Sequence, residues 1–192
     1  MPPKKKFARE QIVDAAFEIA KTEGIGSITI RKIAEKLGSS IAPIYVNFED
    51  VDELVREVIH KIADMSRDML MRHATGDPFR DIGLASLRFA KEYPALFRDL
   101  VMKPNPHMQD YDNEMGILIE QMKRDPQLDG FTGEELRTIL LKMRIFQLGL
   151  SVMAANGLLP EHTDEAWEIG MLDSAAADVL TAARLRKKGA RE

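Results

Sequence analysis

Residues 24–54 read GIGSITIRKIAEKLGSSIAPIYVNFEDVDEL, and this stretch decides the fold. Its first half has apolar residues at the i, i+3, i+4, i+7 spacing of one helical face, formed by Ile30, Ile33, Ala34 and Leu37. Thr29 stands directly before this face and is the expected N-cap. Gly38 follows it and can adopt the left-handed conformation that a tight turn needs. The pattern predicts a short helix that ends in a turn.

A second short helix is expected after the turn, with Ser40 as its N-cap. Ile44 and Phe48 are predicted to face inward, and Tyr45 to lie at the exposed edge. Two short helices joined by a glycine turn form a helix-turn-helix, whose second helix fits the major groove of DNA. The stretch therefore predicts a DNA-binding head.

The spacing also resembles a known family. The stretch is similar to the N-terminal domain of the TetR family of bacterial transcriptional regulators at Gly24, Thr29, Ile33-Ala34, Gly38, Ser40, Ile44-Tyr45, Phe48 and Leu54. This resemblance covers roughly the first third of the chain. It implies a homodimer with two-fold symmetry that binds palindromic operator DNA, and a helical body that binds a small effector. The segments around Tyr93-Pro94 and from Gly149 to Leu158 resemble the family's body more weakly.

The composition is that of a soluble globular protein. The 192 residues are 45% hydrophobic and 30% charged, which suits one or two domains with a real core. No apolar run is long enough to span a bilayer, and no secretory signal follows the N-terminal lysines. The absence of cysteine excludes disulfides and thiolate sites. We expect a cytoplasmic protein without a membrane partner.

The net charge of −4 is unevenly distributed along the chain. Residues 1–48 have eight Lys/Arg and five Asp/Glu, and the remainder has nineteen against twenty-six. This asymmetry suits a basic head on an acidic body, although short segments often differ by a few charges. The helix-turn-helix pattern favours the first interpretation.

Nearly every segment has a helical pattern, so the predicted fold class is all-α. A three-helix head is expected in residues 1–50, and a larger body for effector binding and dimerisation in residues 51–192. The first helix should cover about residues 9–22, and a long fourth helix should start after Asp50 and run to about residue 72. Further helices are expected after Asp77-Pro78 and Tyr93-Pro94, and over about 108–123, 132–155 and 164–186. Asp50 with Glu53, and Thr132 with Glu135, have the spacing of capping boxes.

The residues expected at DNA lie in the head. Lys4 to Lys6 and Arg9 can neutralise phosphates, or the lysines can serve only as a solubilising tail. Arg31 is a candidate for reading guanine, or a solvated surface charge. The predicted DNA-binding set is Lys4, Lys5, Lys6, Thr29, Arg31, Ser39, Ser40, Ile41, Ala42, Pro43, Tyr45 and Asn47.

The head departs from the family pattern in its charges. The groove-facing helix has no Lys or Arg, and Val51 stands where the family usually has a phosphate-binding lysine. The acidic segment Glu49–Glu53 would repel phosphates. Base readout would then depend on short polar side chains and on contacts with thymine methyl groups. The alternative is a helical ligand- or partner-binding module that keeps the fold with weak or lost DNA binding.

The body is rich in flexible and flat apolar side chains. Ten of the eleven methionines lie beyond residue 60. Such residues suit an adaptable pocket for a small apolar effector, although a Met-rich helix face is more often plain core. The predicted pocket residues are Phe89, Phe97, Met102, Met115, Met122, Met143, Phe146 and Gln147.

The last two predicted helices have apolar faces with small residues that permit close helix packing. These faces suit a dimer interface of four helices or packing within one chain, and the resemblance favours the dimer. The predicted interface residues are Leu140, Leu150, Gly170, Ala176, Val179 and Ala183.

Catalysis finds little support in the sequence. The four histidines are scattered, and neither a metal-binding spacing nor a dinucleotide or phosphate loop occurs. We expect neither a metal ion nor a cofactor, and no enzyme. The expected function is a DNA-binding transcriptional repressor that a small apolar effector releases from its operator.

Overall fold

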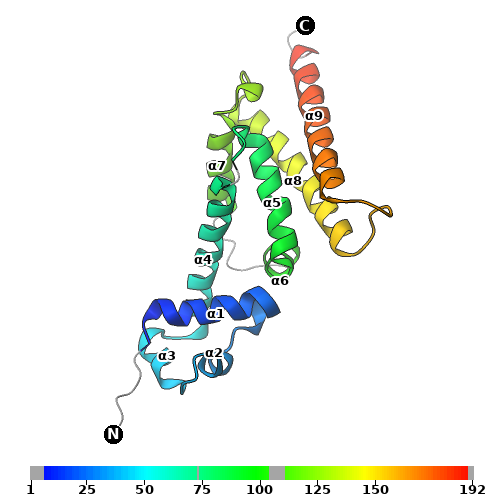
Figure 1. The fold of residues 1–192 in the computed structure, drawn as a ribbon. Coiled ribbons are helices and arrows are strands. Elements are labelled where there is room, and N and C mark those ends of the chain that lie inside the picture. Colours follow the sequence, from blue (N-terminus) through cyan, green and yellow to red (C-terminus); the bar gives the residue numbers. More distant parts are fainter. Residues whose placement is uncertain (1–6, 73, 104–110, 190–192) are drawn as a thin grey trace. The chain divides into compact units, whose positions relative to one another are not determined.

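The computed structural model describes residues 7–72, 74–103 and 111–189, and every regular element within these ranges is a helix (Figure 1). The predicted all-α class is therefore confirmed. The chain divides into two compact units, the first from residues 1–68 and 93–109 and the second from residues 69–92 and 110–192. Each unit has its own core.

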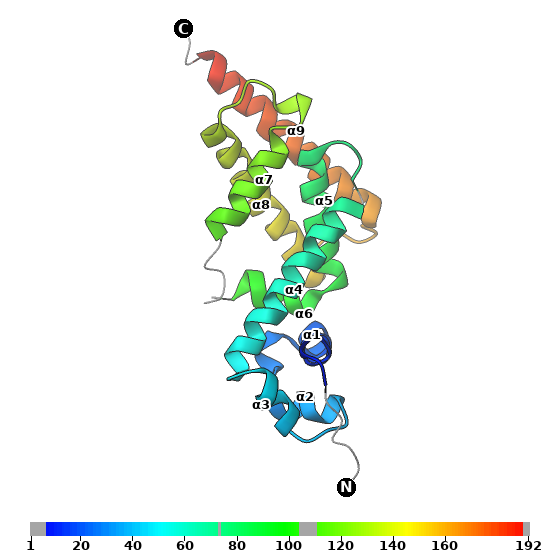
Figure 2. The ribbon, with the colours of Figure 1, turned by 90° about the vertical axis from the view of Figure 1, so that its left-hand side faces the viewer.

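The N-terminal unit begins with the three helices that the sequence predicts. They are α1 (Arg9–Glu23), α2 (Ile30–Lys36) and α3 (Ala42–Asn47), with a 3₁₀ turn η1 (Ile25–Ser27) between the first two. In Figure 1, α2 and α3 lie on the same side of α1, which Figure 2 shows nearly end-on. The core side chains at 0% exposure on α1, α2, α3 and α4 (Val51–Arg72) are Ile12, Ala16, Ala20, Ile33, Ile44, Leu54 and Val58.

A later segment of the chain completes this unit. Helix α6 (Pro94–Phe97) packs against α1, and a π-helical turn η2 (Arg98–Met102) continues it. All three side chains from Ala95 to Phe97 are buried. The boundary predicted after residue 50 falls directly before α4, but the compact unit is larger because α6 and the first part of α4 belong to it.

The second unit contains α5 (Pro78–Glu92), α7 (Tyr111–Met122), the 3₁₀ turn η3 (Pro126–Leu128), α8 (Gly133–Ala155) and α9 (Glu165–Gly189). Helix α8 packs against α5, α7 and α9 (Figure 1). One core cluster joins these elements, with Met122 at 0% exposure and Leu136 and Leu140 at 1%.

Side-chain caps begin the long helices where the sequence predicts them. Thr132 and Glu135 form both bonds of the capping box of α8. The Asp50 carboxylate accepts a hydrogen bond from the Glu53 N–H at 2.7 Å, at the start of α4. The Arg80 N–H donates to Asp77 Oδ1 at 2.9 Å in the first turn of α5. Capping is a local interaction, which is why the sequence predicts it well.

Gly24 joins α1 to η1 with a backbone that only glycine adopts easily. Its φ is 97° and its ψ is 162°. The Asp99 carboxylate lies over its Cα and is held by ion pairs with Arg98 Nε at 3.2 Å and Lys103 Nζ at 2.8 Å. A Cβ at this position would overlap Asp99 Oδ2. Both the dihedral angle and the close approach require glycine here.

Substitution of Gly24 should strain the backbone between α1 and η1. Gly24→Ala should destabilise the N-terminal unit by about 1–3 kcal/mol from backbone strain alone. Gly26→Ala is the matched control, because a Cβ at Gly26 meets nothing within 4 Å. The measurement is protection of the α1 and α2 amides from hydrogen exchange. Equal protection in the two variants would contradict the expected strain.

Candidate nucleic-acid interface and ligand cavity

The helix-turn-helix is built by local sequence and by burial. The Thr29 hydroxyl caps α2 by accepting a hydrogen bond from the Lys32 N–H at 3.3 Å. Gly38 has a φ of 61° and turns the chain toward α3. Ile44 on α3 is fully buried, and Phe48 directly after α3 is 3% exposed. These two anchors fix which side of α3 faces away from the unit.

The expected cap of α3 is wrong. Ile41 is the N-cap of α3 and makes no side-chain cap bond, and Pro43 stands in the first turn. Ser40, the expected cap, precedes Ile41, and its backbone oxygen accepts a hydrogen bond from the Ser39 hydroxyl at 2.9 Å. Proline has a fixed φ that suits a first helical turn, so α3 begins without a polar cap.

Most of the predicted DNA-binding residues are accessible. Tyr45 is 56% exposed and Ile41 is 50% exposed. Thr29, Arg31, Ser40 and Ala42 are exposed as well, and Ser39 and Pro43 are half-buried. Lys4, Lys5 and Lys6 lie outside the described residues. The role of this set at DNA stays a prediction.

Asn47 has a structural role that the sequence did not indicate. Its side-chain amide donates to the Pro43 oxygen at 2.8 Å and to the Phe7 oxygen at 3.4 Å. Its own backbone oxygen accepts a hydrogen bond from Arg9 Nη1 at 2.6 Å. The Asn47 amide therefore joins the end of α3 to the segment that precedes α1.

Arg9 neutralises part of the acidic segment. Its Nη2 lies 2.8 Å from Glu53 Oε1 and 3.0 Å from Glu57 Oε1, and its guanidinium lies 4.1 Å from the centroid of the Phe48 ring. The Glu49 N–H and the Arg9 guanidinium hold the pKa of the Glu53 carboxyl below its usual range. Arg9 is thus engaged within the unit, and the Glu53 carboxylate has a cationic partner.

Among the described large apolar side chains, Val46 has the highest exposure, at 84%, and it was not among the residues predicted to bind DNA. It lies four residues after Ala42 and two residues after the buried Ile44, so Ala42 and Val46 share the outward face of α3. This spacing from Ile44 was the signal that could have identified it.

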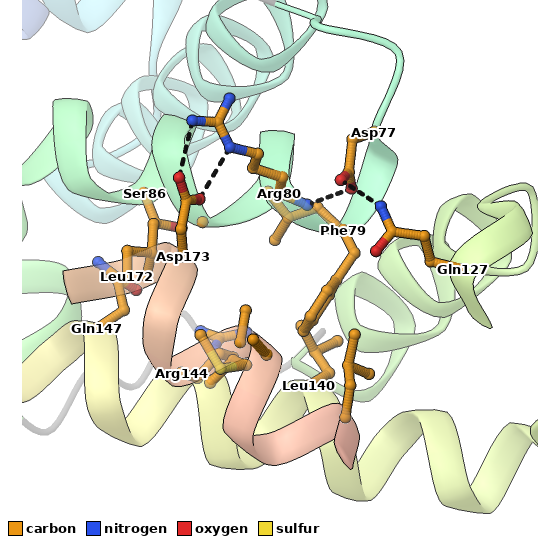
Figure 3. Close-up of a pocket in the computed structure, with 16 residues that line it drawn as sticks. Asp77, Phe79, Arg80, Ser86, Gln127, Leu140, Arg144, Gln147, Leu172 and Asp173 are labelled. Carbon is orange, nitrogen blue, oxygen red and sulfur yellow. Dashed lines mark hydrogen bonds and ion pairs between the residues drawn. The ribbon is translucent and has the colours of Figure 1, made fainter. Parts of the chain in front are cut away.

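The second unit has a partly open cavity of about 220 Å³ between α5, α8 and α9 (Figure 3). Its apolar wall comes from all three helices and includes Phe79, Leu140, Met143, Leu172 and Ala176. A smaller cavity of about 150 Å³ holds a benzene molecule in another protein, so this space is large enough for a small ring system.

Polar groups stand at the border of this cavity. Arg80 forms two bonds with Asp173, Nε to Oδ1 at 2.8 Å and Nη2 to Oδ2 at 3.0 Å (Figure 3). The Gln127 amide donates to Asp77 Oδ2 at 3.0 Å. Burial, together with the neighbouring Asp125 carboxyl, raises the pKa of Asp77 above its usual value. Gln147, 5% exposed, lies on the other side of the view and donates to the Ser151 hydroxyl at 3.3 Å.

The structure distributes the predicted pocket residues over several places. Met143 and Gln147 line the cavity. Met115 and Met122 belong to the core cluster, and Phe146 packs against it. Phe97 is buried in α6 and Met102 is 51% exposed in η2, and both lie in the N-terminal unit. Phe89 is half-buried on α5. Periodicity in the sequence places these side chains on apolar helix faces. It does not show which of them line the cavity and which are packed in the core.

The predicted dimer residues lie mostly inside the chain. Leu140 and Leu150 are 1% and 6% exposed, so the core of the single chain buries them. Ala176, Val179 and Ala183 pack against the same core cluster, while Gly170 is exposed on α9. Leu140 and Leu150 are therefore corrected to core residues.

Another apolar face remains open on both helices. On α8 it contains Leu141, Ile145 and Met153, which are 47%, 64% and 41% exposed and spaced by four and eight residues. On α9 it contains Trp167, Met171 and Leu185, which are 37%, 38% and 63% exposed. The sequence reasoning missed these residues because both sides of α8 are apolar, and only the fold shows which side is buried.

Among the residues that the structure describes, no group of three or more His, Cys, Asp or Glu side chains could hold a metal ion. In the same residues, no helix has both the length and the hydrophobicity needed to cross a membrane.

Comparisons with known proteins place the head in a family context. The model of the family described as "Bacterial regulatory proteins, tetR family" matches residues 12–58, from α1 into α4. The HTH-type transcriptional regulator YvkB of Bacillus subtilis (strain 168) is 27% identical over 128 residues, which are 59% of this chain and 65% of that protein. The nicotine-responsive transcriptional repressor HdnoR of Paenarthrobacter nicotinovorans is 26% identical over 141 residues, covering 62% and 71%.

A solved structure shows the same fold over nearly the whole chain. A transcriptional regulator from Rhodococcus sp. Rha1 superposes with a TM-score of 0.67 and 17% identity, covering 92% of this chain and 97% of that one. The similarity thus extends from the helix-turn-helix through α9.

Proposed function

We propose that this chain, whose residues 12–58 match the model of the TetR family of bacterial transcriptional regulators, binds operator DNA as a homodimer and releases it when a small effector occupies the body. A regulator of this kind acts on the chromosome, so its place is the bacterial cytoplasm. The observation that carries the proposal is the accessible outward side of α3 in a helix-turn-helix that the family model matches.

DNA binding is supported by how the head is held together. Ile44 and Phe48 anchor α3, and Asn47 and Arg9 fix its C-terminal end to α1 and α4. A rigidly held short helix can enter a major groove without reorganising. The proposed contacts are Tyr45 to phosphate, and Arg31 and the outward side of α3 to bases.

The test of DNA binding is selection from random duplex DNA with the purified protein. We expect a palindrome whose half-sites lie one helical turn apart, about 34–36 Å, or a multiple of that distance. Arg31→Ala should then cost about 1–3 kcal/mol and relax preference at one position in each half-site. No enrichment of any sequence, even at low salt, would exclude this function.

Dimerisation is proposed through the open apolar face of α8 and α9. Large exposed apolar patches with regular spacing mark interaction sites more often than chance exposure does. Gly170 and Ala166 on α9 would allow a partner helix to approach closely. Two-fold symmetry would make the patch self-complementary, as a two-fold operator requires.

The effector is proposed to occupy the cavity between α5, α8 and α9. Its apolar wall suits a small, largely apolar compound, and the Arg80–Asp173 pair and the Asp77 carboxyl could orient a polar substituent. Release of DNA needs a coupling of only about 1–3 kcal/mol between the two sites. Helix α4 has residues in both units and is the proposed mechanical connection.

Ala176→Leu tests this site. The added side chain should fill part of the cavity, and it should abolish ligand binding while operator binding and folding persist. A compound present at about 100 times its Kd stabilises the unsubstituted protein by about 2.7 kcal/mol, which thermal denaturation detects in a panel of small aromatic and aliphatic compounds. Ala182→Leu, on the same helix but away from the cavity wall, should keep the response. If both variants respond like the unsubstituted protein, the ligand binds elsewhere.

A second candidate function is a ligand- or partner-binding module with weak DNA binding. The absence of Lys and Arg from α3 favours it. The same selection experiment separates the two candidates, because a module of this kind would retain no particular sequence.

A further inference from the structure

The outward side of α3 has an unusual chemistry for a surface that meets DNA. Ala42 and Val46 form its centre, and Ile41 and Pro43 lie beside them. Val46 is 84% exposed and Ile41 is 50% exposed, so neither contributes much to the core of its own unit. Three exposed aliphatic residues, Ile41, Ala42 and Val46, thus lie within one short segment, with the half-buried Pro43 beside them.

Asn47 is the side chain on α3 that could form two hydrogen bonds with a base edge, but its amide already bonds to backbone oxygens of the protein. Asparagine recognises adenine through its amide, but the Asn47 amide donates to the oxygens of Pro43 and Phe7. Ser39 donates to the Ser40 backbone oxygen. The polar groups left on the outward side are the hydroxyls of Ser40 and Tyr45, and hydroxyls discriminate bases weakly.

The major groove offers one apolar group to such a surface, the C5-methyl of thymine. Resting on the DNA-binding function proposed above, we propose that α3 reads its operator half-sites chiefly through thymine methyl groups, which Ala42 and Val46 contact with Ile41 at the edge. Arg31, on α2, would add a separate guanine contact. Burial of a methyl group between aliphatic side chains excludes water, and cytosine, which has no methyl, leaves that space unfilled.

The experiment replaces each thymine of the selected half-site with deoxyuridine. This substitution removes the methyl group and keeps the Watson–Crick pairing, the donors and the acceptors. We expect at least one position in each half-site at which affinity falls about fourfold for each methyl group buried in the complex. Deoxyuridine in the flanking DNA should have no effect.

Val46→Ala identifies the side chain that makes the contact. In this variant the difference in affinity between thymine and deoxyuridine should disappear at one position and persist at the others. At that position the thymine methyl group has lost the Val46 side chain that it contacts, so removing the methyl group as well changes nothing further. Val46 is exposed, so alanine should not disturb folding, and α1 and α2 amide protection verifies this. Met71→Ala, at an exposed methionine of α4, is the control and should leave every thymine preference unchanged.

The outcomes separate the two proposals. Selection of an operator whose affinity is the same with thymine and deoxyuridine at every position would overturn the methyl readout and leave the DNA-binding function standing. Failure to select any sequence would overturn both. A thymine preference that Val46→Ala leaves intact at every position would overturn the assignment to this face of α3.

Discussion

Aspartate at Ile145 is expected to produce a monomer and to weaken operator binding by about 10²–10⁴-fold. Ile145 is 64% exposed on α8, between Leu141 and Met153. In a dimer formed by this face, the new carboxylate would be buried without a partner, which strongly disfavours association. A monomer binds the operator with one head only, so it lacks the additional affinity that two linked heads gain when they bind two half-sites together. Sedimentation equilibrium and DNA titration at the same protein concentration measure the two effects.

The matched control for this variant is Met71→Asp. Met71 is 69% exposed on α4 and lies outside the proposed interface, so the same change of chemistry should leave the dimer intact. Because Ile145 is exposed in the single chain, its replacement should also leave helix content unchanged. A dimer that survives Ile145→Asp would place the interface on another surface.

The second large effect is expected at Ile44. Its side chain is fully buried beneath α3, and Ile44→Ala should destabilise the N-terminal unit by about 2–5 kcal/mol, through lost burial and the cavity left behind. Val46→Ala, two residues along the same helix, removes a side chain that is 84% exposed and should change stability by less than about 0.5 kcal/mol.

Hydrogen exchange of the amides in α1, α2 and α3 measures this difference. It reports the opening of one unit, whereas a single unfolding midpoint would average over two units that can unfold separately. Similar protection in the two variants would mean that α3 is not anchored through Ile44.

Local signals predicted the helices well. The apolar spacing of α2, the positive φ of Gly38 and the capping box of Thr132 and Glu135 all depend on residues within one turn of each other. Such features follow from propensity and periodicity alone. The class of fold and the order of the helices could therefore be predicted from the sequence.

Contacts between distant residues could not be predicted in the same way. The bond from Asn47 to Phe7 and the ion pairs of Arg9 join residues about forty positions apart, and they give two residues expected at DNA a role in the scaffold as well. On α8 both sides are apolar, so periodicity could not decide between Leu140 and Leu141 as the buried residue. The cavity wall likewise depends on how three helices meet.

The placement of α6 in the N-terminal unit has a consequence for synthesis of the protein. Leu96 is fully buried and its helix packs on α1, so the partner of that α1 surface is made long after α1 itself. At about 5–20 residues per second, the ribosome needs about 1.5–6 seconds to pass from the end of α4 to the end of η2. During that interval the nascent head has α1, α2 and α3 but lacks the α6 packing partner of α1. A shortened chain that stops within α4 would keep this unfinished state permanently, with the α1 surface that α6 covers left exposed to solvent.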